Sequence, residues 1–330
     1  MKSYFDGPNK RPPEVVEGLI REGQIAVLGG TYGVGKSPAI AQLAVCVSKG
    51  KPFCSRKTDR RRVIMFDLEN DGDVCRGNIH RISQELGGRL PRVPDDLDIH
   101  LAHDRTPPKQ RRLSAFDYDD RDHIKLLESR LKKAPNALII IDPVELFFEF
   151  DKLNGRDVLR QYKRLRALSV DYPCAAYLLT FNLRKRDRRT RKADLLQEPR
   201  DWLDEVAGSM DIMNRSDVRI GMDFYDEDIR IINGVRRNED FDPLLIKPIG
   251  KPDALAGFRR VKPRELNILR ALTKRQREQL AVLPDRFRFE AVADKLVPRA
   301  SLYRLINRAK SLRLLKQADD GRYRKADVSR

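Results

Sequence analysis

The residues Gly30-Thr-Tyr-Gly-Val-Gly-Lys-Ser37 point to the fold class of this chain, because they match the phosphate-loop pattern G-x-x-x-x-G-K-S/T at every specified position. An apolar run, Gln24-Ile-Ala-Val-Leu-Gly29, precedes the loop as a buried strand would, and helical apolar spacing begins at Pro38. Strand, glycine loop and helix stand in the order that the motif requires, which predicts a binding site for ATP or GTP. The alternative, a glycine-rich turn that binds nothing, does not explain this context.

The residues of the loop have distinct expected roles. Glycines let backbone N–H groups approach the phosphates, Lys36 reaches the β- and γ-phosphates, and the Ser37 hydroxyl holds Mg²⁺. Pro38 fits the first helical turn, where its missing N–H costs no hydrogen bond. We therefore expect a site for ATP and Mg²⁺ with contacts from Gly30, Thr31, Tyr32, Gly33, Val34, Gly35, Lys36, Ser37 and Pro38.

The composition favours a nucleic-acid partner. The 330 residues include 67 Lys or Arg against 49 Asp or Glu, a formal net charge of +18. Such an excess suits a polyanion, and no lipid-anchor motif or long apolar run points to a membrane. The first residues lack the apolar core of a signal peptide, and the four cysteines share no ligand spacing, so we expect a cytoplasmic protein with reduced thiols.

Alternating strands and helices predict an α/β fold with a mainly parallel sheet that is covered on both faces. After the phosphate-loop helix, strands are expected at residues 62–69, 97–101, 137–142 and 175–180, and helices at 74–86, 123–133 and 159–172. Shorter strands at 218–222, 228–232 and 244–246 are expected to extend the sheet in antiparallel fashion. The expected domains are an N-terminal arm (1–20), an ATPase domain (21–247), a Pro- and Gly-rich linker (248–261) and a small C-terminal domain (262–330).

The C-terminal domain resembles a winged helix-turn-helix. Helices are expected near Leu266, from Phe289 and from a cap at Ser301, and an Asp-Gly turn predicts a closing hairpin. Residues 262–330 hold 19 Lys or Arg and 8 Asp or Glu. The outer face of the third helix is expected to bind DNA through Arg299, Tyr303, Arg304 and Arg308. A solvated basic face on a protein-binding module is the alternative.

Hydrolysis needs a carboxylate to hold Mg²⁺ and another to orient the attacking water. Asp142 ends the most apolar strand and is the expected Walker B residue, so Ser37 and Asp142 form the expected metal site. Glu69, at the end of another strand, and Glu145, three residues after Asp142, compete for the role of base. Asp67 is a third candidate, because strand alternation lets it point the same way as Glu69. Spacing does not decide between Glu69 and Asp67, and we expect Glu145 to be a surface or capping residue.

These residues carry a family resemblance. The sequence resembles RecA-type ATPases, and within them the RepA-type replicative helicases of plasmids and mobile elements. The shared features are Glu17-Gly-Leu-Ile, the phosphate loop, Pro52-Phe, Phe66-Asp-Leu-Glu, Ile141-Asp-Pro, the strand ending near Asn182 with Lys185, Gly208-Ser209 and Arg237-Asn238. The resemblance implies a RecA-like core in which Glu69 is catalytic. It also implies that Asn182 takes the place of a histidine that senses the γ-phosphate, whereas Phe181 cannot.

Ring-forming members of this family complete each ATP site with an arginine from the adjacent subunit, which stabilises charge on the transferring phosphoryl group. Two residues match positions of such an arginine. Arg215 follows Gly208-Ser209 with a shift of about two residues in the spacing, and Arg237 precedes Asn238. The sequence leaves both open.

A basic run follows the strand that ends near Asn182. Residues 184–192 hold seven positive side chains, where RecA-type proteins carry a loop that faces a central channel. Without an aromatic residue the run is expected to bind the phosphates of single-stranded DNA through Arg184, Lys185, Arg186, Arg188, Arg189, Arg191 and Lys192. A merely solubilising run is the alternative. Phe147, Phe148 and Phe150 are candidates for base stacking or for the core.

The resemblance implies a DNA-dependent ATPase that forms a homo-hexameric ring and acts as the replicative helicase of a mobile element. Its expected partners are single-stranded DNA, double-stranded DNA at the winged helix, further copies of itself, and a replication initiator or primase. The alternatives are an ATP-regulated initiator or loader, a RecA-like recombinase, and a DNA-binding regulator that uses nucleotide only as a ligand. Retained Glu69 and Asp142 argue against the last of these.

Overall fold

The chain forms two compact units, Met1–Arg260 and Val261–Arg330, which are described separately. The computed structural model describes residues 11–87, 93–103, 114–115, 123–148, 155–182, 193–204, 215–237, 239, 241–251, 254–262, 265–266, 272, 274–312, 314–318 and 320–325. Within these residues, no helix combines the length and the apolar character that a membrane span requires.

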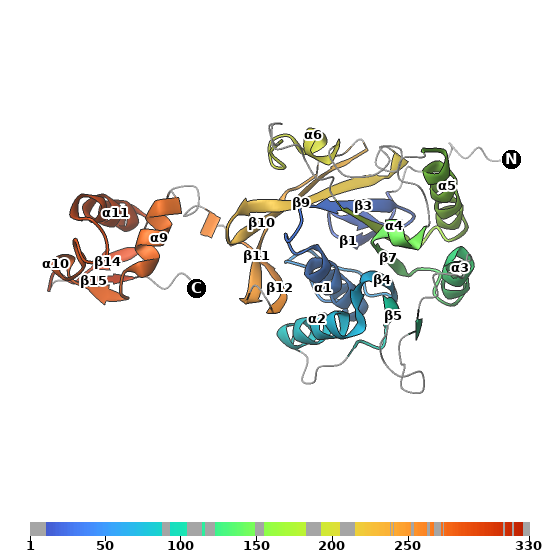
Figure 1. Cartoon of the computed structure of the whole chain (residues 1–330), viewed down its shortest axis with the longest axis horizontal. Helices are drawn as coiled ribbons and strands as arrows, with labels where there is room; N and C mark the ends of the chain where they lie inside the picture. Colours follow the sequence, from blue (N-terminus) through green and yellow to red (C-terminus); the bar gives the residue numbers. More distant parts are fainter. Residues whose placement is uncertain are drawn as a thin grey trace. The chain divides into compact units, whose positions relative to one another are not determined.

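A ten-stranded sheet forms the centre of the first unit, in the order β12-β11-β10-β9-β3-β8-β7-β4-β5-β6 (Figure 1). Neighbouring strands from β9 to β6 are parallel, and those from β9 to β12 are antiparallel. The predicted α/β fold with a mainly parallel sheet is confirmed, although β9 pairs parallel to β3. The bounds are β3 Ile25–Gly30, β4 Val63–Asp71, β5 Leu97–His103, β6 Ser114–Ala115, β7 Leu138–Asp142, β8 Ala176–Asn182, β9 Val218–Asp226, β10 Ile229–Arg236, β11 Leu244–Lys251 and β12 Ala254–Arg260.

Helices cover both faces of this sheet, as the apolar strands require. Side chains of β3 alternate: Ala26 and Leu28 join the core with α1 and α2, whereas Ile25 and Val27 join the core with α3 and α5. The central parallel strands β3, β4, β7 and β8 therefore have two buried faces, and their polar side chains concentrate near the carboxyl ends. The bounds are α1 Lys36–Lys49, α2 Gly72–Glu85, α3 His123–Lys133, α4 Val144–Phe147, α5 Gly155–Asp171 and α6 Pro199–Asp204.

The N-terminal segment is more structured than the expected arm. Strands β1 (Glu14–Val16) and β2 (Ile20–Arg21) form a small antiparallel hairpin. Val15 and Val16 are fully buried in the core beside α1. The folded unit thus begins before residue 21, because two consecutive apolar side chains here have a core to enter.

Residues 248–261 do not form the expected linker. They contribute the end of β11 and all of β12, the edge of the central sheet. The register shifts between Pro248 and Gly250, and Gly250 and Gly257 have φ angles of 93° and 114°. Proline and glycine therefore mark a bulged edge strand here, a position where both residues are tolerated.

Strand β12 is fixed to the phosphate-loop helix by one side chain. The Gln42 Nε2 donates to the Phe258 carbonyl at 2.8 Å, and the Phe258 N–H donates to Gln42 Oε1 at 2.8 Å. Both residues are buried. The Phe258 ring also packs below the loop, since a Cβ on Gly35 would stand 2.8 Å from its Cζ. The last strand of the first unit thus supports the beginning of α1.

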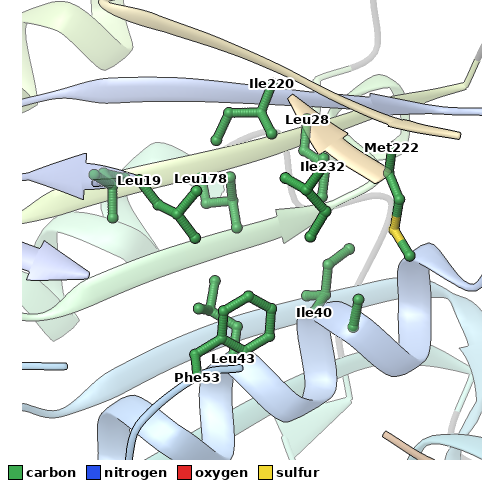
Figure 2. A pocket seen from close by; sticks show the side chains of 11 residues that line it. Leu19, Leu28, Ile40, Leu43, Phe53, Leu178, Ile220, Met222 and Ile232 are labelled. Carbon is green, nitrogen blue, oxygen red and sulfur yellow. The ribbon is translucent and has the colours of Figure 1, made fainter. Parts of the chain in front are cut away.

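An apolar cavity of about 40 Å³ lies between α1 and the sheet (Figure 2). Its lining is wholly apolar: Leu19, Ile20, Leu28, Ala39, Ile40, Leu43, Phe53, Leu178, Ile220, Met222 and Ile232. A cavity with no polar partner holds water poorly, so this space is dry. It reflects imperfect packing of the first turns of α1 against β3, β8 and β9.

The second unit combines helices with a small sheet. Strands of this sheet run in the order β13-β15-β14, and all pairs are antiparallel. The predicted hairpin is present, whereas the third helix begins at Arg299 rather than after Ser301. Its core includes Leu302, Leu305 and Ile306 on one face of that helix. The bounds are α9 Lys274–Val282, β13 Arg286–Phe287, α10 Phe289–Val292, α11 Arg299–Ser311, β14 Leu315–Gln317 and β15 Tyr323–Lys325.

Candidate functional site

The phosphate loop connects the end of β3 to the start of α1, as the motif predicts. Gly33 and Gly35 have φ angles of 72° and 98°, a conformation that glycine adopts without strain. A β9 residue fixes the start of the loop: the Thr31 hydroxyl donates to the Asp223 carboxylate at 2.7 Å. The Trp202 indole N–H donates to the other oxygen of Asp223 at 2.9 Å. The loop is therefore held from the β9 side before any ligand binds.

The exposure of the loop residues fits a phosphate cradle. Tyr32 is 97 % exposed and Gly33 is exposed, whereas Val34 is buried below them. A Cβ on Gly33 would meet no described atom within 4 Å, so space lies open at the tip of the loop. Ser37 and Pro38 are half-buried in the first turn of α1. Of the predicted contact residues, Tyr32 and Gly33 are thus exposed at the tip of the loop, whereas Gly30 and Val34 are buried beneath it.

Lys36 lies at the centre of a group of carboxylates. Its ammonium donates to the Gly30 carbonyl at 3.0 Å, which bends the side chain back over the loop. Burial lowers the pKa of Lys36, and the negative charges of Asp142, Glu69 and Glu145 oppose that shift. An ammonium has three donors, so a lysine among carboxylates that donates to one backbone carbonyl keeps donors for an anionic ligand.

Asp142 is the buried carboxylate of this group. It ends β7 and stands in register with Asp67 of β4. The Thr180 hydroxyl donates to its Oδ1 at 2.5 Å, while its Oδ2 is buried without a hydrogen-bond partner among the described residues. Burial raises the pKa of Asp142 to about 7, with the charges of Asp67 and Glu69 adding to the rise. An orphaned buried oxygen fits the expected role of ligand to hydrated Mg²⁺, whose charge would favour the ionised form.

The three candidates for the base differ in their surroundings. Asp67 is buried, and its Oδ1 accepts from the Asn70 side chain at 2.9 Å and the Asn70 N–H at 3.2 Å, so it organises the end of β4. Glu69 is exposed, and its charge acts on both Lys36 and Asp142. Glu145, in α4, is half-buried, and its charge acts on Lys36. The structure therefore brings Glu145 to the site, where we expected a surface residue, and leaves two candidates.

The predicted sensor position lies at the same edge of the sheet. Asn182 ends β8, and its backbone pairs with Gly30 at the start of the phosphate loop. Phe181 is buried in the core on the other face, consistent with its exclusion from the site. Because β8 lies between β3 and β7, Asn182 falls between Lys36 and Asp142 in the order of the strands.

The two candidate finger arginines lie at the opposite end of the parallel strands, where β3 begins. The exposed Arg237 follows the end of β10, and its guanidinium donates to the carbonyl of the exposed Arg215 at 3.5 Å. The Asp217 N–H donates to the Ile25 carbonyl at 2.9 Å, which places this segment at the beginning of β3. The six residues of β3 separate them from the phosphate loop by roughly 20 Å. Neither arginine reaches the phosphate loop of its own chain, so a role in catalysis requires a second subunit.

The predicted DNA-binding residues of the second unit divide into two kinds. Tyr303, Arg304 and Arg308 are exposed on the outer face of α11. Arg299 instead forms ion pairs with Glu290, at 2.5 Å, and with Asp294, at 3.4 Å. Its charge is offset by carboxylates from α10 and the turn before α11, so it joins two elements of the unit. Sequence alone did not reveal this pairing, because the acidic partners are five and nine residues away.

The remaining sequence predictions concern the basic run and the phenylalanines. The residues of the basic run, 184–192, lie outside the described residues, as does Phe150. Phe147 and Phe148 are buried in the core of the α3 and α5 face, with ring centroids 4.9 Å apart. Neither is available for stacking on a base in this arrangement, and the alternative of a core role is confirmed for both.

Sequence reasoning did not identify Thr180 and Asp223, which fix the two sides of the site. Thr180 orients Asp142, and Asp223 anchors Thr31 of the loop. Threonine is common in β-strands, so its presence in an apolar strand gave no sign that Thr180 belongs to the site. Asp223 carried one signal: it follows an apolar run, as the other strand-end carboxylates do.

Comparison with known proteins agrees with this geometry. Residues 3–187 match the family model described as the AAA domain, and this match covers more than half of the chain. No curated protein matches the sequence. The matched residues include the phosphate loop, Glu69, Asp142 and the strand that separates β3 from β7. The chain therefore belongs to the AAA domain family of P-loop ATPases.

Proposed function

We propose that this protein is a DNA-dependent ATPase that couples hydrolysis of Mg-ATP to movement along single-stranded DNA. The observation that carries the proposal is the placement of Lys36 among Asp142, Glu69 and Glu145 at the end of the phosphate loop. Lys36 would neutralise developing phosphoryl charge, Asp142 and Ser37 would hold Mg²⁺, and Glu69 would orient water. These residues supply the parts that hydrolysis needs, beyond those that binding needs.

A DNA partner is supported by charge and by the second unit. Residues 262–330 carry 19 Lys or Arg against 8 Asp or Glu, and α11 exposes Tyr303, Arg304 and Arg308 on one face. The order of α9, β13, α10, α11 and the β14–β15 hairpin resembles that of a winged helix, which supports the proposal. We infer that this unit docks DNA, and that the basic run 184–192 contacts the single strand.

The proposed assembly is a homo-hexameric ring of the RepA-type replicative helicases found in mobile elements. Arg215 and Arg237 lie at the sheet edge opposite the phosphate loop of their own chain, a position that suits an arginine supplied to an adjacent subunit. A replication initiator or primase is the proposed further partner. The second candidate, an ATP-regulated initiator or loader, is favoured by the outer face of α11, which suits reading of duplex DNA.

The first experiment measures steady-state ATPase with and without single-stranded DNA, together with the mass by light scattering in Mg-ATP. We expect stimulation by DNA and a hexamer. Lys36→Ala should lower turnover at least about a thousandfold, because the group that neutralises phosphoryl charge is lost. Lys49→Ala, at the other end of the same helix, is the matched control and should keep normal turnover. Normal turnover in Lys36→Ala would refute the ATPase proposal, and a DNA-indifferent monomer or dimer would refute the motor and favour the initiator.

A second experiment tests the DNA face of the second unit. The double variant Arg304→Ala, Arg308→Ala should bind duplex DNA more weakly. The slope of log K against log salt concentration should become less steep by about 0.9 for each lost phosphate contact. Arg299→Ala should have a much smaller effect on the salt slope, because its charge is already paired with Glu290 and Asp294. Equal effects of the two sets would show that α11 does not contact the phosphates as proposed.

A further inference from the structure

The positions of the carboxylates predict on which side of the phosphate loop the γ-phosphate lies and on which side the nucleoside lies. The carboxylates that act on Lys36 come from β4, from the end of β7 and from α4, and thus lie on the β7 and β4 side of β3. A triphosphate whose γ-phosphate points to them has its nucleoside end on the other side of the loop, toward β9 and β10. Strand β9 is parallel to β3, so the turn between β9 and β10 stands at the same edge of the sheet as the phosphate loop.

Two residues of that turn region form a pair beside the loop. The Arg230 guanidinium carbon lies 4.2 Å from the centroid of the Phe224 ring. The Arg230 Nε donates to the Val34 carbonyl at 3.1 Å, and Nη1 donates to the Glu227 carbonyl at 2.8 Å. These bonds hold the pair directly against the phosphate loop. Phe224 is 41 % exposed, which is unusual for a phenylalanine that already packs against a guanidinium.

We propose that Phe224 and Arg230 form the platform on which the nucleobase stacks. An exposed aromatic ring beside a guanidinium that backbone carbonyls fix in place offers a polarisable surface, and every base has a π-face to place on it. Such a surface does not read the edge of the base, so it accepts purines and pyrimidines alike, with purines bound more tightly through their larger area. The inference rests on the proposed ATPase function and adds a role for residues outside the motif.

A comparison at the other end of β10 supports this assignment. Arg236 and Phe241 form a similar pair there, with the guanidinium carbon 5.9 Å from the ring centroid. Arg236 is buried beside Glu14 and Glu239, and Phe241 packs against the core. That pair is part of the fold, whereas Phe224 keeps an exposed surface next to the loop and Arg230 donates to the backbone carbonyls of Val34, Glu227 and Ile229.

The test compares a ligand that carries a base with a ligand that consists of phosphates alone. Affinities for a non-hydrolysable ATP analogue and for inorganic tripolyphosphate are measured by calorimetry with Mg²⁺. Phe224→Ala should weaken the analogue about tenfold, the usual loss for one base–aromatic stack, and leave tripolyphosphate unchanged. Phe224→Leu keeps the apolar bulk and should give the same loss, which guards against a folding defect. Arg230→Lys keeps the charge but not the planar group and should also weaken the analogue selectively.

Phe241→Ala is the matched control and should change neither affinity. Equal loss of both ligands in Phe224→Ala and Phe224→Leu, or no loss of the analogue, would overturn the platform. If the unaltered protein binds neither ligand, the proposed function itself fails. If it binds tripolyphosphate and the analogue equally well, the phosphate site stands and the platform does not.

Discussion

The two edges of the central sheet treat buried charge in opposite ways. At the edge where the strands begin, Arg61 has a side chain only 1 % exposed, and it pairs with Glu22 and Asp59 and donates to the carbonyls of Asn136 and Cys174. At the phosphate-loop edge, Asp142 is equally buried, yet one carboxylate oxygen has no partner among the described residues.

The contrast separates charges that stabilise the fold from charges that serve a ligand. Arg61 connects the segments before β7 and β8, so its ion pairs and hydrogen bonds set the spacing of the strands. Asp142 carries a free-energy cost that only a cation or a proton relieves, and such uncompensated groups gather where a ligand binds. Removing the charge of Arg61 should therefore destabilise the fold. Removing the charge of Asp142 should abolish activity and should leave the fold as stable as before or more stable.

The largest effect on stability is expected at the edge where the strands begin. Arg61→Ala should lower the free energy of unfolding by about 3 kcal/mol, because the variant leaves Glu22 and two carbonyls without their buried donor. Urea unfolding measures the change. Its neighbour Arg60, which is 70 % exposed and pairs with Asp96, is the control, and Arg60→Ala should cost under about 1 kcal/mol. Equal costs would mean that Arg61 does not organise this edge.

The next effect concerns the two glutamates at the phosphate-loop edge. Glu69→Gln should lower kcat about a hundredfold, as expected for loss of a group that orients or deprotonates water. Glu145→Gln should keep kcat near that of the unaltered protein, because we assign it the electrostatic support of Lys36. Single-turnover ATPase assays at saturating nucleotide separate the two. The reverse ranking would transfer the role of base to Glu145.

The smallest effect tests the cost of burying Asp142. Its pKa rises from 3.8 in the unfolded chain to about 7 in the folded protein, so the folded protein binds the extra proton between these values. Stability without nucleotide should then fall as the pH rises through this window, and Asp142→Asn should remove that dependence. We expect the variant to be more stable than the unaltered protein at pH 8, and by much less at pH 4.5, where the folded protein already holds the proton. A stability difference that stays the same at all pH values would show that burial does not raise the pKa of Asp142.

The parallel core and its phosphate loop could be predicted because each strand is buried on both faces. Such strands are continuous apolar runs, and the polar residues that end them, Glu69 and Asp142 among others, are visible against that background. The same logic locates the site at one edge of the sheet. It cannot rank Glu69 over Glu145, because α4 returns Glu145 toward Lys36 by a turn that spacing does not reveal.

The edge strand and the pairing of Arg299 were missed for a different reason. Pro248, Gly250 and Gly257 are typical of a linker, and only the sheet beside them shows that they form a bulged strand. Arg299 has the charge of a DNA contact, and only the placement of Glu290 and Asp294 shows that it also forms ion pairs within its own unit. The sequence reveals neither feature, because the deciding contact lies in another element.

The link between Gln42 and Phe258 has a mechanical consequence. The second unit begins at Val261, directly after β12, so tension on that unit enters the first unit through this strand. The two 2.8 Å hydrogen bonds between the Gln42 side chain and the Phe258 backbone would carry part of the load onto the helix that begins at Lys36. Force from a bound polymer would thus arrive at the helix that ends the phosphate loop, within two turns of its first residue.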